Sequence, residues 1–278
     1  MKGIDDKLRQ LKTILSEMDG VVIGYSGGVD STLLAAVAAE VLGDRAVCVL
    51  ASSETYPSSE IEEAIETARS LGLNLVRIDT DELANEEFVR NTPERCFFCK
   101  MELFTKLIEI AEEHGIRWVA DGANVDDLQD YRPGSRAGAE LGVRSPLREA
   151  GFAKEEIREA SRRMGLPTWD KPAFACLSSR IPYGTRIESK VLARLDEAER
   201  FLKGLGFRQV RVRHHGTIAR IEVDPAEIAR LASAEVREAV ARKFENLGYT
   251  YATLDLRGYR TGSMNAVLNL RSEEGSGC

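Results

Sequence analysis

The chain has 278 residues, of which 43% are hydrophobic and 30% charged, so it can bury a sizeable core as one large or two modest domains. The formal net charge of −7 argues against a polyanion as the main partner, and we expect no nucleic-acid partner. No apolar run approaches the roughly 20 residues of a membrane span and the N-terminus lacks a signal-peptide pattern, so we expect a cytoplasmic protein with no membrane partner.

The first part of the chain alternates helical and extended patterns. Apolar spacing predicts helices over residues 4–18, 31–42, 58–71, about 100–114 and 154–164. Short apolar runs predict strands over residues 21–25, 46–50, 74–78 and 117–120. Strands that alternate with helices of this length indicate an α/β fold with a doubly wound parallel sheet and crossover helices.

The pattern changes in the last third of the chain. Helices are predicted over residues 189–202 and 225–247, and strands over 209–214, 218–223 and 250–254, with a hairpin turn at 214–217. These elements fit a second, smaller α+β domain. We therefore expect residues 1–170 to form one domain and residues 171–278 a second, with Cys176 at the junction.

A glycine-rich stretch, YSGGVDST at residues 25–32, separates the first predicted strand from the next helix. Such a turn leaves backbone N–H groups unpaired at the positive end of the helix, which suits a phosphate group. Gly27 and Gly28 allow close approach, Ser26 and Ser31 offer hydroxyl groups, and Asp30 could hold a divalent cation. The spacing and lysine of the Walker loop are missing, and a plain turn leaves the Asp-Ser pair unexplained.

Two further loops follow strands of the same predicted sheet, at residues 52–54 and 121–124. They should face the crevice of the glycine-rich loop, so Ser53 and Gly122 are candidates for binding the ribose and adenine of a nucleotide. The next loop contains Asp126, Asp127 and Asp130, which are possible Mg²⁺ ligands. An acidic loop is more often simply solvated, so their roles stay open.

Five cysteines in a cytosolic-looking chain favour metal or redox chemistry over disulfides. Cys48 lies in an apolar run and fits a buried small side chain, Cys278 ends a Gly-Ser tail, and a function for either stays open. Cys96 and Cys99 form a C-x-x-C just ahead of a predicted helix. Together with Cys176 they suit zinc, an iron–sulfur cluster or a redox dithiol.

Zinc normally has a fourth Cys or His ligand, and none is apparent near these three cysteines. Three thiolates without a fourth therefore suggest a [4Fe–4S] cluster with one iron open to a group that is not protein. The alternative is that the thiols are partly buried and pack against neighbouring phenylalanines. A C-x-x-C by itself does not separate the two.

An alternation of apolar and basic residues at 210–214 places Arg211 and Arg213 on one face of a strand. Two neighbouring guanidinium groups can hold a phosphate through forked hydrogen bonds, and Arg260 is a third candidate. The alternative is a solvated strand face paired with Glu222 across the hairpin, and the pattern favours neither.

These stretches together resemble the LarE family of ATP-dependent sulfur transferases, which act in the synthesis of the nickel-pincer nucleotide cofactor. The SGGVDS sequence resembles the loop of the PP-loop ATP pyrophosphatases, whose fold is adenine nucleotide α-hydrolase-like. The stretch C-x-S-S-R-x-P-Y-G, from Cys176 to residue 184, is more specific to the LarE family. The resemblance extends almost from end to end, through residues 25–32, 91–93, 130–134, 176–184, 210–213, 218–222 and 253–256.

The resemblance implies that ATP adenylates the carboxylates of pyridinium-3,5-biscarboxylic acid mononucleotide and that sulfur then converts them to thiocarboxylates. It implies ATP and Mg²⁺ as cofactors and an AMP- and pyrophosphate-forming reaction. It also implies roles for three residue groups: Ser26, Gly27, Gly28, Asp30 and Ser31 for ATP and Mg²⁺; Arg211, Arg213 and Arg260 for the substrate phosphate; Cys176, Ser179, Arg180, Glu199 and Glu222 for sulfur transfer.

The family has two sulfur sources. In one branch a single cysteine at the position of Cys176 gives up its own sulfur, and the positions of Cys96 and Cys99 are not cysteine. This chain instead resembles the branch in which three cysteines hold a [4Fe–4S] cluster that carries a hydrosulfide supplied by sulfide or a sulfur donor. We therefore predict an enzyme that is not consumed by its reaction, with a homo-oligomeric assembly.

Three other functions fit parts of the pattern. A PP-loop tRNA thiolase can also carry three cysteines and a cluster, but it needs many phosphate contacts, which the acidic chain does not suggest. A nucleotide sensor without catalysis would have no use for the cysteines. A zinc-stapled α/β protein is distinguished by metal analysis.

Overall fold

The computed structural model describes residues 3–129, 133–172 and 175–260. Its backbone contacts divide the chain into two units, Met1–Phe174 and Ala175–Cys278, and each is described by itself. Two candidates from the sequence, Asp130 and Cys278, lie outside the described residues. No helix in the described part of the chain is long and apolar enough to cross a membrane.

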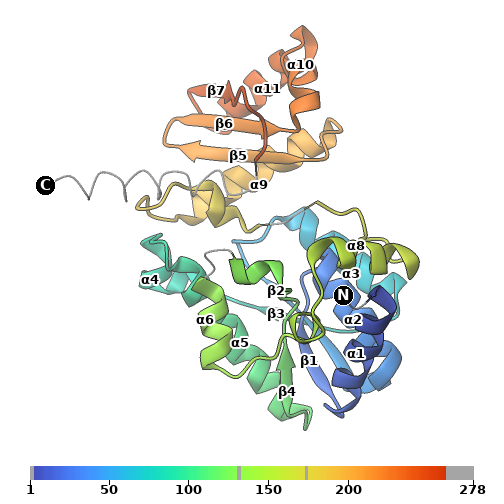
Figure 1. Cartoon of the computed structure of the whole chain (residues 1–278). Coiled ribbons are helices and arrows are strands. Elements are labelled where there is room, and N and C mark those ends of the chain that lie inside the picture. The colour runs from blue at the N-terminus through green and yellow to red at the C-terminus, as the bar shows by residue number, and fades with distance from the viewer. Residues whose placement is uncertain (1–2, 130–132, 173–174, 261–278) are drawn as a thin grey trace, which may run out of the picture. The chain divides into compact units, whose positions relative to one another are not determined.

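The first unit is built on a parallel sheet, as the sequence predicts (Figure 1). Its strands are β1 (Val21–Gly24), β2 (Ala46–Ser52), β3 (Asn74–Asp79) and β4 (Trp118–Ala120), in the order β3-β2-β1-β4. All three neighbouring pairs are parallel. The chain passes from the β3 edge to the far side of β1, so the loops after β1 and β4 leave the sheet side by side at the point where ligands of such sheets bind.

Helices cover both faces of this sheet, so its strands are apolar on both sides. Val21 and Ile23 of β1 pack in one core with α1 (Ile4–Ser16), α2 (Val29–Leu42) and α8 (Lys154–Arg163). Val22 points to the opposite core, which it shares with α5 (Arg95–Glu113). A third cluster joins β2 to α3 (Ser58–Ser70). The expected α/β fold with helices on two faces is thus confirmed.

Three boundaries in the first unit differ from the predicted ones. Helix α5 begins at Arg95 because a turn at Thr92 and Pro93, with Arg95 N donating to Thr92 O at 3.0 Å, starts the helix early. Cys96 and Cys99 therefore lie in the helix and not ahead of it. Helix α2 begins at Val29 instead of residue 31. The region predicted as a loop at 126–134 contains a 3-10 turn and the start of a helix that packs on α5. The shorter elements are η1 (Gly43–Arg45), η2 (Glu82–Ala84), α4 (Glu86–Val89), η3 (Asp126–Gln129), α6 (Pro133–Glu140) and α7 (Pro146–Glu149).

The second unit combines helices with a small mixed sheet. Strands β5 (Val210–His215) and β6 (Ile218–Val223) are antiparallel, and β6 is parallel to β7 (Tyr251–Leu254). The β5–β6 turn is only two residues long, with Gly216 at a φ of +65°, a conformation that favours glycine. Helix α9 (Ser189–Gly204) packs on β5.

The prediction of a single helix over residues 225–247 is wrong. The segment forms η5 (Pro225–Glu227), α10 (Ile228–Leu231) and α11 (Ala234–Asn246). The break falls at Ser233, whose extended backbone, with φ −60° and ψ 150°, precedes α11 as its N-cap residue. Serine favours this position over a helix interior, which apolar spacing alone does not reveal.

Candidate functional site

The glycine-rich loop forms a tight turn between β1 and α2. Gly27 has a φ of +67°, and a Cβ at this position would lie 2.5 Å from the Cβ of Ala64 on α3, so only glycine fits. Ser31 closes the turn, because its Oγ accepts a hydrogen bond from Ser26 N and donates one to Gly28 O, each at 3.2 Å. The first N–H groups of α2 thus lie next to a turn that leaves room for a phosphate.

The loop after β4 lies directly against the first turn of α2. A Cβ on Gly122 would come within 3.1 Å of Ser31 N and 3.3 Å of Asp30 Cβ, so this close approach favours glycine. The structure therefore brings together Gly122 and the glycine-rich loop, two segments that the sequence analysis assigned to one nucleotide site.

Asp30 is held on both carboxylate oxygens. Its Oδ1 accepts a hydrogen bond from Asn124 Nδ2 at 3.1 Å. Its Oδ2 forms an ion pair with the Nζ of Lys154, and Lys154 is the first residue of α8. Lys154 was missed by sequence reasoning because it lies more than a hundred residues from the loop and outside any motif. A lone lysine at a helix start gives no signal of its own.

Asp126 and Asp127 accept hydrogen bonds from the backbone. Asp126 Oδ2 accepts from Lys154 N at 2.7 Å, and Asp127 Oδ2 accepts from Asn124 N at 2.9 Å. Both carboxylates therefore brace the loop that presents Asn124 to Asp30.

Ser53 lines a cavity of about 270 Å³ at the carboxyl ends of β2 and β3. The Ser53 Oγ lies 2.9 Å from Thr55 Oγ1, which fixes the turn after β2. The lining is largely acidic and includes Glu82, whose Oε1 accepts a hydrogen bond from Thr80 Oγ1 at 3.0 Å. Cys99 Sγ reaches the same oxygen at 3.8 Å.

The cysteines differ in environment. Cys96 is exposed and Cys99 partly buried, and their spacing of three places them on one face of α5. Cys176 is partly buried and belongs to the second unit. Burial raises the pKa of Cys48 to about 12, as expected for a packed thiol without chemical function. Within each unit, the described residues contain no group of three or more His, Cys, Asp or Glu side chains placed to hold a metal ion.

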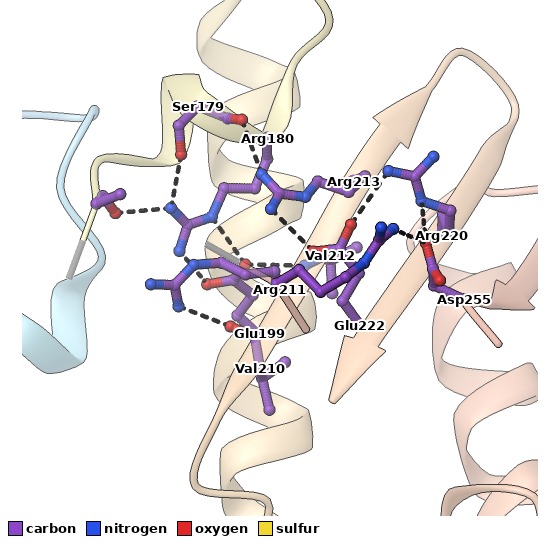
Figure 2. Close-up of polar contacts among 12 residues, drawn as sticks. Ser179, Arg180, Glu199, Val210, Arg211, Val212, Arg213, Arg220, Glu222 and Asp255 are labelled. Atoms are coloured by element: carbon purple, nitrogen blue, oxygen red, sulfur yellow. Dashed lines mark hydrogen bonds and ion pairs between the residues drawn. The ribbon is translucent and has the colours of Figure 1, made fainter. Parts of the chain in front are cut away.

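Arg180 is the centre of a buried network in the second unit (Figure 2). Its Nη1 donates to the carbonyl oxygens of Ala175 and Cys176, at 2.7 and 2.9 Å, and to Ser179 Oγ at 2.9 Å. Its other two nitrogens pair with both oxygens of Glu199. Although burial opposes the charge, the attraction of Glu199 raises the pKa of Arg180, and that of Arg180 lowers the pKa of Glu199.

A second chain of ion pairs follows β5 and β6. Arg213 Nη2 lies 2.8 Å from Glu222 Oε2, and Arg220 Nη2 lies 3.1 Å from Glu222 Oε1. Arg220 also pairs with Asp255 at 3.4 Å, and Arg260 contacts the same carboxylate at 3.9 Å. Arg213 Nη1 donates to Ser179 O at 3.0 Å, which joins this chain to the Arg180 network.

The solvated strand face considered as an alternative is wrong. Arg211 and Arg213 are only 8% and 5% exposed. The first five residues of β5 are all buried, so both faces of this strand are covered. The pairing of Arg213 with Glu222, which was part of that alternative, is present. Arg260 joins the set only through Asp255 and is half exposed.

Positive charge exceeds negative charge in this network. The network contains five arginines and three carboxylates, and Arg211 Nη1 also donates to Val210 O at 2.8 Å. Burial and then the nearby charge of Arg180 lower the pKa of Arg211, whose guanidinium also lies over the Tyr259 ring. A bound anion would relieve this repulsion. The eight side chains are Arg180, Arg211, Arg213, Arg220, Arg260, Glu199, Glu222 and Asp255.

A parallel sheet with the SGGVDS loop at its switch point defines an ATP-dependent enzyme of the PP-loop class. In agreement, residues 3–96 match the family model described as NAD synthase. A glutamine-hydrolyzing GMP synthase of Shewanella halifaxensis is 29% identical over 190 residues, which cover 59% of this chain and 34% of that protein.

Several relatives are similar over almost the whole chain. The pyridinium-3,5-bisthiocarboxylic acid mononucleotide synthase of Lactiplantibacillus plantarum is 39% identical over 269 residues, covering 96% of this chain and 97% of that protein. An uncharacterized protein of Synechocystis is 44% identical over 265 residues, covering 95% and 99% respectively. The chain therefore belongs to the family of this synthase, the LarE family.

Proposed function

We propose that this enzyme uses ATP to convert the two carboxylates of pyridinium-3,5-biscarboxylic acid mononucleotide to thiocarboxylates for nickel-pincer nucleotide synthesis. One observation carries the proposal: Cys176 and two of the arginines expected to hold a phosphate, Arg211 and Arg213, surround the buried Arg180 in one unit. The similarity to the Lactiplantibacillus synthase, whose product is a thiocarboxylated mononucleotide, supports the same substrate class.

The first unit would supply ATP. Backbone N–H groups of Gly27, Gly28 and the start of α2 would hold the phosphates, with Ser26 and Ser31 closing the loop. Asp30 is an oxygen donor of the kind that Mg²⁺ prefers, in the first turn of α2. Ser53 and Gly122 would contact the ribose and adenine.

The second unit, Ala175–Cys278, would bind the mononucleotide. The phosphate of the mononucleotide would bind near Arg211 and Arg213 and relieve the repulsion between neighbouring guanidinium groups, with Arg260 at the exposed end of the set. A substrate carboxylate oxygen then attacks the α-phosphorus of ATP, the bond from that phosphorus to the bridging oxygen breaks, and pyrophosphate leaves. A sulfur nucleophile attacks the acyl carbon, and AMP leaves with the electrons of the broken C–O bond.

The proposed sulfur carrier is a [4Fe–4S] cluster held by Cys96, Cys99 and Cys176. The donor set fits, because cysteine thiolates are the usual ligands and two of the three occupy one face of a helix. When bound, the cluster would supply hydrosulfide, replenished from sulfide or a sulfur donor, so that the protein is not consumed. Arg180 would hold the Cys176 backbone and keep Ser179 in place, while Glu199 and Glu222 keep the arginines oriented.

The test is anaerobic reconstitution with iron and sulfide, followed by absorption spectra and iron analysis. We expect a cluster spectrum that Cys96→Ala, Cys99→Ala and Cys176→Ala each abolish, and repeated thiocarboxylate formation with pyrophosphate release. A protein without iron that converts Cys176 to dehydroalanine, detected by mass spectrometry, would instead demonstrate sacrificial sulfur transfer. Salt-sensitive binding of tRNA and thiolation of that tRNA would favour the tRNA thiolase.

A homo-oligomer is also proposed. Tyr251, on the last strand of the small sheet, and Leu256 just beyond it are 61% and 86% exposed, and large apolar side chains at a sheet edge are typical of contact surfaces. Light scattering of the purified protein tests this, and a monomer at micromolar concentration would contradict it.

A further inference from the structure

Glu82 in the first unit is a buried carboxylate that pairs with no cation in the described part of the chain. It is 1% exposed, and its Oε1 accepts hydrogen bonds from two neutral donors, Thr80 Oγ1 at 3.0 Å and Cys99 Sγ at 3.8 Å. Its Oε2 has no hydrogen-bond partner among the described residues. Buried charges in proteins are generally paired or bound to a metal ion, so this carboxylate points to a missing cation.

The cavity beside Glu82 is acidic. It measures about 270 Å³, and the described residues that line it include no lysine or arginine. The nearby Lys106 is already held, because its Nζ donates to Asp79 O at 2.6 Å and lies 3.6 Å from Glu102. A water molecule takes about 30 Å³ in the liquid, so the cavity has room for a cation with several waters. The four carboxylates of the lining are Glu54, Asp79, Asp81 and Glu82.

The distance between Cys99 Sγ and Glu82 Oε1 suits a single metal ion. Cysteine sulfur binds zinc at about 2.3 Å and carboxylate oxygen binds it at about 2.1 Å. At a tetrahedral angle, these bond lengths place the two donor atoms about 3.6 Å apart, close to the observed 3.8 Å. No third donor side chain is placed for the ion among the described residues, so water from the cavity would complete its coordination. An ion held in this way leaves more readily than one in a closed four-ligand site.

We propose that Glu82 and Cys99 form a site that captures ferrous iron for loading onto the cysteines. Mixed sulfur and oxygen donors suit a transition metal better than Mg²⁺. On binding, the S–H bond of Cys99 breaks, an Fe–S bond replaces one Fe–water bond, the proton passes to solvent, and the iron stays ferrous. The loading role rests on the proposed function, in which Cys99 holds a cluster, whereas the binding of the ion rests on the cavity alone.

Cobalt tests the site directly, because Co²⁺ has ligand preferences close to those of Fe²⁺ and its bond to a thiolate gives a charge-transfer absorption band. The full-length double variant Cys96→Ala, Cys176→Ala keeps Cys99 but cannot hold a three-cysteine cluster. In it we expect one Co²⁺ per chain with the thiolate band, displaced by ferrous iron under anaerobic conditions. Adding Glu82→Gln should weaken Co²⁺ binding at least about 10-fold, and adding Cys99→Ser should abolish the band.

A matched control removes a neighbouring carboxylate that does not line the cavity. Glu102 Oε1 accepts a hydrogen bond from Asp81 N at 2.8 Å and pairs with Lys106, so Glu102→Gln removes a negative charge close by without removing a donor to the ion. In the same double variant, we expect it to change the Co²⁺ affinity by less than about twofold, because salt screens a charge outside the cavity. Thermal unfolding of each variant establishes that it is folded.

Cluster reconstitution distinguishes a loading site from a permanent one. In otherwise wild-type protein at limiting ferrous iron, Glu82→Gln should slow reconstitution by the same factor as it weakens metal binding, and the final iron content should equal that of wild type. An unchanged rate, or a lower final content, would overturn the loading role. The absence of a thiolate band in the double variant, or equal Co²⁺ binding after Glu82→Gln, would overturn the site. A wild-type protein that forms no cluster, although its double variant shows the band, would overturn the proposed cluster and leave the metal site in place.

Discussion

Arg180 and Glu199 form a doubly bonded ion pair in which both charges are withdrawn from solvent. Nε to Oε1 and Nη2 to Oε2 are each 2.9 Å, and the side chains are 1% and 3% exposed. Replacing Arg180 by Met leaves Glu199 buried without its main partner. We expect a loss of about 3–5 kcal/mol in the free energy of unfolding at pH 7, measured by urea denaturation. A loss below about 1 kcal/mol would contradict this assignment of the pair.

The same pair makes a prediction about pH. Burial alone would raise the pKa of Glu199, but Arg180 outweighs it and lowers that pKa below the unfolded value of about 4.3. The stabilisation is therefore complete above about pH 4.3 and is lost as the pH falls through the folded pKa. In the Arg180→Met variant, burial dominates and raises the pKa of Glu199. The loss of unfolding free energy relative to wild type should therefore be smaller at pH 5 than at pH 7. A deficit that is independent of pH would contradict this reasoning.

Phosphate should stabilise the protein through Arg211. We expect inorganic phosphate to raise the melting temperature of wild type, because a ligand that binds only the folded state stabilises it. The Arg211→Gln variant should lose most of this shift in melting temperature. It should bind the mononucleotide about 10- to 100-fold more weakly, and it should bind the dephosphorylated nucleoside as wild type does. Arg194, which lies over the Tyr249 ring much as Arg211 lies over Tyr259, supplies the control Arg194→Gln. Equal effects of the two substitutions would argue against a phosphate site.

Gly27→Ala should abolish ATP binding. The new methyl group would lie 2.5 Å from Ala64 Cβ, and the backbone also has positive φ, so either α3 or the loop must move. Gly43→Ala is the matched control, since Gly43 has a φ of +55° but nothing within 4 Å of the added Cβ. Both variants should lose about 1 kcal/mol from backbone strain, and only Gly27→Ala should lose the nucleotide site. Calorimetry with ATP provides the measurement.

Cys48 should resist alkylation in the folded protein. Its pKa of about 12 keeps it as a thiol at pH 8, and it is buried, whereas Cys96 is exposed. Peptide mapping after iodoacetamide treatment should find Cys96 modified first and Cys48 only after unfolding. Labelling of both residues at similar rates in native protein would show that the β2 core opens readily.

Local sequence patterns predicted most of the fold. Runs such as residues 46–50 carry enough apolar side chains to define a strand buried on both faces, and the glycine-rich loop defines its own turn. Boundaries failed where a single backbone feature decided them, as Pro93 did for α5 and Ser233 for the break before α11. Helix periodicity does not contain that information.

The sequence predicted only those parts of the site that lie in local motifs or directly after predicted strands. Gly122 and Ser31 were assigned to one crevice because their loops follow strands of one predicted parallel sheet, and the structure brings the two residues together. Lys154 was missed, since nothing near it in the sequence indicates Asp30 as a partner. The burial of Arg211 and Arg213 was also beyond reach, because alternation reports which side chains share a face and not whether a helix covers that face.

The position of Arg211 beside Arg180 implies a conflict between heat resistance and affinity. Repulsion between these guanidinium groups costs stability in the second unit, so selection for thermal tolerance alone should favour a neutral residue in place of Arg211. That replacement would yield a more stable protein that binds its mononucleotide less tightly. The free energy of unfolding of the protein without ligand is thus limited in part by the arginines that bind the mononucleotide.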